Sequence, residues 1–184
     1  MRHDGSVSST DQSQQGWRCA SCGTEHVGLA VAFGTPAPAP WEWASPEERA
    51  AGELNADMCV LRGPDGSSFY LRGQLEIPVV DAEIDRFVWG VWVSLSEANM
   101  QSTADHWQDP ERSSLAPMFG WLCTTLDYEQ PTVGLTAIVH TRPPGQAPWI
   151  ELDPTASHPL VGEQRDGISL HRVAEINAKV LWSA

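Results

Sequence analysis

The sequence has almost no lysine: Lys179 is the only one among 184 residues. Lysine and arginine together number 11, against 24 aspartate and glutamate residues, so the formal net charge is −13. A chain of this charge repels the phosphate backbone of nucleic acids and anionic lipid headgroups. The composition therefore argues against a function in nucleic-acid binding and predicts no nucleic-acid partner.

Long apolar runs are also missing. No segment approaches the roughly 18 apolar residues that a membrane-spanning helix needs. The segment Met1–Thr10 contains no apolar stretch of the secretory-signal type. We therefore expect a cytoplasmic protein without a membrane partner. In that reducing compartment, its four cysteines would bind metal or stay free rather than form disulfides.

Several signatures of enzymes are absent as well. The sequence contains no phosphate-binding loop, no dinucleotide-binding glycine motif and no G-x-S-x-G nucleophile motif, and no internal repeat is visible. The length suits one domain with its own core. Residues 1–15 are rich in Ser, Gln and Asp, and we predict a disordered tail there. Residues 16–184 are predicted to form a single α+β domain.

The most informative motif that is present runs from Trp17 to His26. Cys19 and Cys22 are two residues apart, Gly23 follows, and His26 comes four residues after the second cysteine. This spacing allows two thiolates and an imidazole to reach one centre, and zinc binds such ligands readily. We therefore predict zinc as a cofactor, held in a knuckle over residues 17–34.

The fourth zinc ligand is open in the sequence. Cys59 is the first candidate, because a strand could place it beneath the knuckle, and Cys123 is the weaker one, because its flanks resemble a buried strand. A water molecule in the fourth position would leave the metal open for hydrolysis. Free thiols and a redox C-x-x-C are the two alternatives without metal. The redox motif would need a strand-to-helix setting that is not evident here.

Periodicity predicts the rest of the fold. Apolar or alternating runs predict strands at 57–62, 68–77, 86–95, 119–125, 135–141 and 149–152, and the second of these should pair with the first as an antiparallel hairpin. Helix-start signals occur at Ser45 and at Ser94 or Ser96, and a helix with one apolar face begins near Ser169. We predict an α+β fold with a mainly antiparallel twisted sheet, two or three helices and the zinc-knuckle-like turn.

A proline run separates the knuckle from the first predicted helix. Residues 35–40 alternate proline with threonine or alanine, which predicts polyproline II across the surface. Trp41 and Trp43 follow directly. They either form an exposed pair that binds a peptide or another subunit, or they fold back as a lid over the sheet. The lid is favoured because tryptophan is highly buried on average.

Polar residues gather in the last third of the chain, among prolines and glycines. The weak catalytic candidates are His140, Glu151, Asp153 and His158, and Glu163 and Arg165 belong to the same group. A histidine beside a carboxylate can act as a general base with an orienting partner. Ordinary loop polarity explains the same pattern, since surface ion pairs are common and seldom functional.

A set of motifs over residues 17–182 resembles a known bacterial family. The motifs are W-x-C-x-x-C-G-x-x-H from Trp17, Asp57-x-Cys59, L-R-G-x-L-E-I-P from Leu71, W-G-V-W-V-S-L-S from Trp89, F-G-W-L from Phe119, His140-Thr141, E-L-x-P-T from Glu151, H-P-L from His158 and E-Q-x-x-G-I from Glu163. The family is the bacterial domain of unknown function numbered 2199. This resemblance implies no activity and no catalytic residue.

These observations favour a binding function over an enzymatic one. We expect a zinc-containing binding or regulatory module that contacts a protein partner. The alternative is a small hydrolase that uses an open zinc site or a histidine–carboxylate pair from the C-terminal loops.

Overall fold

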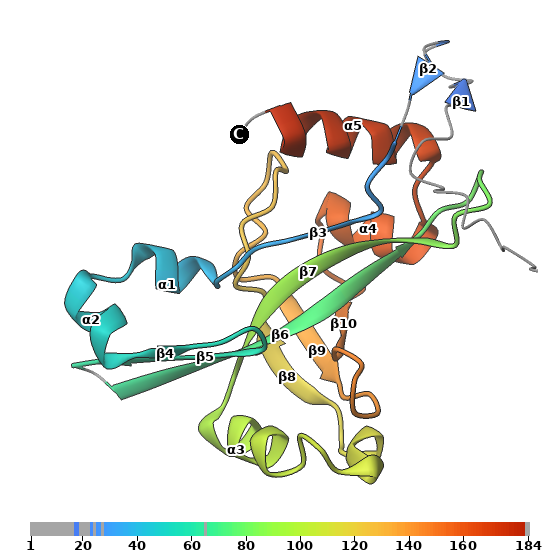
Figure 1. Cartoon of the computed structure of the whole chain (residues 1–184). Coiled ribbons are helices and arrows are strands. Elements are labelled where there is room, and N and C mark those ends of the chain that lie inside the picture. Colours follow the sequence, from blue (N-terminus) through green and yellow to red (C-terminus); the bar gives the residue numbers. More distant parts are fainter. Residues whose placement is uncertain (1–16, 19–22, 24, 27, 65, 183–184) are drawn as a thin grey trace, which may run out of the picture.

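Strand β6 (Gly66–Pro78) is the central strand of the fold and pairs with three other strands. The structure is a computed structural model that describes residues 17–18, 23, 25–26, 28–64 and 66–182. One edge of β6 pairs along its length with β7 (Arg86–Leu95), antiparallel. The other edge pairs first with β5 (Met58–Gly63) and further on with β10 (Trp149–Leu152). Strand β6 therefore belongs both to a protruding hairpin and to the central sheet (Figure 1).

The central sheet curls so that the strand at its far end comes back to β7. Strand β10 pairs with β9 (Thr136–His140), which pairs with β8 (Met118–Trp121). At the end of β8, Leu122 bridges Val93 of β7, and the Cys123 amide donates a 2.7 Å hydrogen bond to the Trp92 carbonyl. Strands β6 to β10 thus close a five-stranded barrel.

Alternation along the barrel strands separates an inner face from an outer one. Inward side chains from every barrel strand form the main hydrophobic core, including Leu75, Val91, Val139 and Ile150, which are fully buried. The residues between them point outward, as the period of two along a strand requires. The predicted strand at 86–95 is confirmed as β7, with the expected bounds, and the predicted hairpin is confirmed as β5 and β6.

The sheet is mixed, so the prediction of a mainly antiparallel sheet was wrong. Strand β3 (Ala32–Gly34) runs parallel to β7, and β10 runs parallel to β6. Both parallel pairs join strands that are more than 50 residues apart in the chain. Turn residues indicate hairpins between neighbouring strands, but they carry no signal for pairings of this kind.

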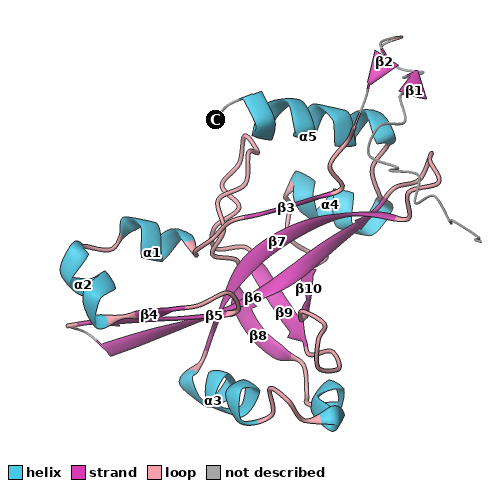
Figure 2. Ribbon diagram, viewed as in Figure 1, coloured by secondary structure: helices cyan, strands magenta, loops and turns pink. Residues whose placement is uncertain are grey.

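The described residues form five α-helices, where two or three were expected. They are α1 (Ala39–Trp43), α2 (Pro46–Ala51), α3 (Glu97–Asp105), α4 (Pro159–Asp166) and α5 (Leu170–Trp182), with a 3₁₀ helix η2 at Pro110–Ser114. Helix α3 lies at one end of the barrel, whereas α4 and α5 lie at the other (Figure 2). The short strands β1 (Trp17–Arg18), β2 (Glu25–His26) and β4 (Glu53–Leu54) complete the elements.

Helix α1 takes up the end of the segment that was predicted as polyproline II. It begins at Ala39 with Pro40 in its first turn, where proline is tolerated because that amide needs no intrahelical acceptor. Trp41 packs on a second buried cluster, so the lid interpretation is confirmed for this residue. Trp43 is 67% exposed, so it does not share that role.

The second cluster lies on the outer side of the hairpin. Its buried members are Cys59, Tyr70, Trp92 and Cys123. The Trp92 indole donates to the Thr35 carbonyl at 3.1 Å, and the Ala39 amide donates to the Cys123 carbonyl at 2.7 Å. These bonds fasten the segment leading into α1 over the sheet, so this part of the outer face is covered.

Two further predictions concern the N-terminal tail and membrane-spanning helices. The proposed tail at residues 1–15 lies outside the described residues. Among the described helices, none combines the length and apolar character that a membrane crossing requires.

Candidate functional site on the outer face of the barrel

The outer face of β8, β9 and β10 carries large side chains that the described residues leave half-exposed or partly buried. On β8, Phe119 and Trp121 are 48% and 51% exposed, and their rings meet edge to face at 5.0 Å between centroids. The strand register places Phe119 opposite Ile138, and His140 opposite Trp149. We call these five residues the outer aromatic face.

His140 is the polar member of this face. Its Nε2 lies 2.8 Å from Oε2 of Glu151, and its ring lies 4.8 Å from the Trp149 ring between centroids. His140 and Glu151 come from the neighbouring strands β9 and β10, so the barrel itself holds them together. The structure thus brings together two of the predicted catalytic candidates. Within the described residues, no Ser, Thr or Cys side chain hydrogen-bonds to His140.

An arginine–glutamate network continues the outer face from this pair across β6. Glu76 accepts from Arg142 at 2.6 Å and from Arg86 at 2.7 Å, one through each carboxylate oxygen. The second terminal nitrogen of Arg142 reaches Oε1 of Gln74 at 3.3 Å. Each oxygen of the Glu76 carboxylate therefore already has an arginine partner, which makes Glu76 a poor candidate for contacting a ligand.

The other predicted catalytic candidates lie away from His140. Asp153 closes a turn by accepting hydrogen bonds from the Thr155 hydroxyl and the Thr155 amide. Both bonds lower the pKa of the Asp153 carboxyl, and the bond from the hydroxyl has the larger effect. His158 precedes α4, where its Nδ1 accepts from the Leu160 amide at 3.1 Å. Both side chains have structural partners, so the predicted loop cluster separates into distinct places.

Glu163 belongs to a partly buried network at the helical end of the barrel. It accepts a short hydrogen bond from the Tyr128 hydroxyl and a 2.8 Å bond from Nε of Arg172. Burial, followed by the bond to Glu163, raises the pKa of the Tyr128 phenol. Arg165 instead pairs with its neighbour Asp166 on the surface. This network joins α4 and α5 to the chain after β8.

The predicted zinc ligands fall partly outside the part of the chain that the structure describes. Cys19 and Cys22 are outside the described residues, and His26 is described only as a β2 residue opposite Trp17. Cys59 is fully buried against Tyr70 and Trp92, and burial raises the pKa of its thiol to about 12. In the described ranges, no three His, Cys, Asp or Glu side chains gather closely enough to hold a metal.

The exposed aromatics of β8 were missed as site residues by the sequence interpretation. Phe119 and Trp121 were assigned to a strand and to the family resemblance, without a role. Their spacing contained the signal, because residues two apart on a strand share one face. Gly120 between them faces inward, and both aromatic rings must then face outward.

Comparison with known families identifies the relationship. A family model described as "Uncharacterized protein conserved in bacteria (DUF2199)" matches residues 18–168. The chain belongs to the DUF2199 family. No curated protein and no solved structure matches it. Membership confirms the resemblance found in the sequence, and the family description names no activity.

Proposed function

We propose that this DUF2199 protein is a binding module that docks a protein partner on the outer aromatic face. The observation that carries the proposal is the half-exposed pair Phe119 and Trp121 on β8. Aromatic side chains are enriched among the residues that dominate binding energy at protein interfaces. An exposed apolar patch of this kind commonly marks an interaction site.

The setting of the pair supports a docking role. The aromatic rings stand on a closed barrel, so binding would require little backbone rearrangement. Beside them, His140 and Glu151 already satisfy one another at 2.8 Å and provide a polar rim that a partner can meet. Hydrophobic centres with polar rims are typical of protein interfaces.

Site-specific photo-crosslinking in cells tests this proposal. A photoreactive amino acid at position 121 should trap one defined protein, whereas the same group at position 43 should not, although Trp43 is also exposed. The trapped protein is then purified and titrated. Replacing Phe119 and Trp121 by alanine should weaken its binding at least about 100-fold, as loss of interface hot spots does. Equal trapping at both positions, or unchanged affinity, contradicts the proposal.

We also propose a structural zinc ion bound by Cys19, Cys22 and His26, with Cys59 as the fourth ligand that the sequence favours. The support is the spacing of the first three residues. Cys59 sits among apolar neighbours with a raised pKa, and its role needs thiolate formation there. Zinc content near one per chain that persists in Cys59→Ala would remove Cys59 from the ligand set. Protein with no metal and reactive Cys19 and Cys22 would refute the zinc proposal.

A small hydrolase is the second candidate, because His140 and Glu151 form a positioned imidazole–carboxylate pair. Such a pair can orient a general base that activates water. Hydrolysis of a panel of activated esters and amides tests this function. Loss of turnover in both His140→Ala and Glu151→Gln supports it, while absent turnover in the parent protein, or equal turnover in the variants, excludes it.

A further inference from the structure

A concave feature lies on the outer face, where β3, β6 and β7 meet. The cleft has a volume of about 350 Å³ and is lined by Ala32, Phe33, Gly34, Asp57, Arg72, Gly73, Gln74, Val88, Gly90 and Ala147. Its size falls within the range of small-molecule pockets. We call it the Arg72 cleft. It borders the outer aromatic face, because Gln74 of the cleft is the register partner of Trp149, but a ligand bound there would not depend on the proposed docking function.

Paired glycines leave room for the Arg72 guanidinium. Gly34 on β3 and Gly90 on β7 are register partners. A Cβ atom on Gly34 would lie 2.9 Å from Nη2 of Arg72, and one on Gly90 would lie 3.4 Å from the same nitrogen. The guanidinium therefore lies over a stretch of bare backbone, in a position that side chains at these two places would disturb.

Arg72 has few partners of its own. Its only side-chain hydrogen bond to a described residue is a 3.4 Å contact from Nη1 to the Ala56 carbonyl. By comparison, Arg86 and Arg142 on the same outer face each hold a carboxylate oxygen of Glu76. A guanidinium has five N–H donors in a planar fork that matches a carboxylate. Most donors of Arg72 thus remain available in the cleft.

Asp57 supplies the opposite charge in the same cleft. The Arg72 amide donates to the Asp57 carbonyl at 2.8 Å, which extends the β5–β6 ladder beyond the Met58–Leu71 pair. Asp57 and Arg72 are therefore cross-strand neighbours, and both line the cleft. No ion pair joins them, and the Asp57 carboxylate accepts no hydrogen bond from the described residues, although it acts electrostatically on the buried Arg112, whose pKa it raises against the larger lowering effect of burial.

A guanidinium and a carboxylate that line one small cleft without pairing with each other suit a ligand that carries both charges. We propose that the Arg72 cleft binds a free α-amino acid, whose carboxylate pairs with Arg72 and whose ammonium group pairs with Asp57. The amide nitrogen of Gln74 lies at the same wall without a partner among the described residues and can donate to the carboxylate. Ala32, Val88 and Ala147 offer apolar contacts, which favour an apolar side chain on the ligand.

Three leucine derivatives test the charge requirement on the unmodified protein. L-Leucine should bind in calorimetric titration and raise the melting temperature. N-acetyl-L-leucine lacks the ammonium group and L-leucinamide lacks the carboxylate, and each should bind about 10- to 100-fold more weakly, because each leaves one charged partner unmatched. The other standard L-amino acids are titrated in the same way. If none of them binds, or if the three leucine compounds bind equally, the proposal is wrong.

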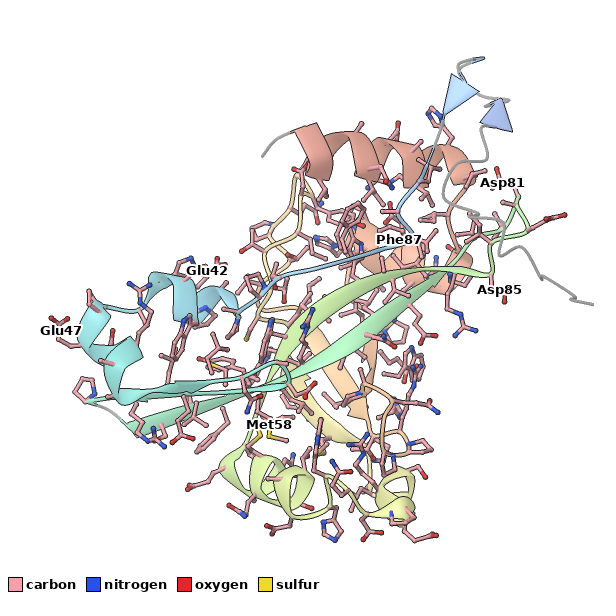
Figure 3. All side chains as sticks on the ribbon, in the orientation of Figure 1. Glu42, Glu47, Met58, Asp81, Asp85 and Phe87 are labelled. Atoms are coloured by element: carbon pink, nitrogen blue, oxygen red, sulfur yellow. The ribbon has the colours of Figure 1, made fainter. Side chains whose placement is uncertain are left out.

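Matched variants assign the charges. Arg72→Gln should remove the preference for leucine over leucinamide, and Asp57→Asn should remove the preference for leucine over N-acetyl-leucine. Arg86→Gln is the control for arginine, and Asp85→Asn is the control for aspartate, since Asp85 lies at the distant turn between β6 and β7, far from the neighbourhood of Met58 (Figure 3). Unchanged selectivity in Arg72→Gln would overturn the proposal. If that variant fails to fold, Arg72→Lys and the leucine comparison still decide it.

Discussion

Arg112 shows how a single residue organises a large part of this barrel. Its side chain is 1% exposed, yet it pairs with no carboxylate among the described residues. It donates instead to the carbonyls of Trp107, Arg142, Pro143 and Gln146, and its guanidinium lies 4.5 Å from the centroid of the Trp107 ring. One buried cation thereby ties η2 and the end of α3 to the loop between β9 and β10.

Replacing this arginine should be severe. We expect Arg112→Met to lower the free energy of unfolding by about 3–5 kcal/mol, because it leaves buried carbonyls without donors. Arg112→Lys should recover only part of that loss, since one ammonium group cannot reach all four carbonyls. Urea unfolding measures both. Arg49→Met is the matched control, as Arg49 makes one exposed 3.4 Å bond. Equal stability of Arg112→Met and the control would contradict this role.

At the level of elements, the seam between β7 and β8 decides whether the barrel closes. The Trp121 amide donates to the Ser94 hydroxyl at 3.1 Å, and the Trp92 amide donates to the Thr124 hydroxyl at 2.7 Å. Next to the first of these bonds the strands approach so closely that a Cβ on Gly120 would lie 2.0 Å from the Ser94 carbonyl oxygen. The seam therefore depends on glycine at this position.

The seam can be tested with two glycine substitutions. Gly120→Ala should destabilise the protein by at least about 2 kcal/mol, because the clash is with backbone and cannot relax by a rotamer change. Gly162→Ala in α4 should have the opposite sign, a gain of about 0.5–1 kcal/mol, since its Cβ meets nothing within 4 Å. Thermal unfolding of the two variants compares them directly. A Gly120→Ala protein as stable as the parent would rule out the tight seam.

Elements with a strong local signal were predictable from the sequence. Strand β7 is rich in β-branched and aromatic residues and almost continuously apolar, and α5 repeats apolar residues at helical spacing, so both were found. Helix α4 was missed because Pro159 and Gly162 obscure its pattern. The parallel pairings and the barrel seam depend on contacts between distant segments, for which a local pattern contains no information.

The candidate site was predictable only in part, for the same reason. His140 and Glu151 were both named, but only the register of β9 and β10 shows that they touch, while His158 and Glu163 face elsewhere. The role of Arg72 depends on two glycines from other strands, which the sequence around Arg72 cannot reveal.

At the scale of the whole molecule, the protein has two buried clusters: the main core inside the barrel and the second cluster on the outer side of the sheet, which contains two thiols. Cys59 and Cys123 share a cluster with Tyr70 and Trp92, beneath Trp41. Burial raises the pKa of both thiols, that of Cys59 from an ordinary 9.0 to about 12. The folded protein thus holds these protons more tightly than the unfolded chain does, and the global stability becomes dependent on alkaline pH.

The sign of this dependence is set by the raised pKa. In protein freed of zinc with a chelator, where Cys59 is a thiol and not a metal ligand, its contribution to stability is complete below pH 9 and is lost as the pH rises towards 12. Between these limits we expect its loss to approach about 1.4 kcal/mol per pH unit, the value for one proton. Cys59→Ala should be less stable at neutral pH, and above pH 9 its free energy of unfolding should fall less steeply with pH than that of the parent, by that amount. Val60→Ala on the same strand removes no titrating group and should keep the slope of the parent. Urea unfolding across this range measures the three proteins. Parallel curves for all three would mean that the Cys59 thiol ionises as easily in the folded protein as in the unfolded chain, and that the second cluster does not exclude water.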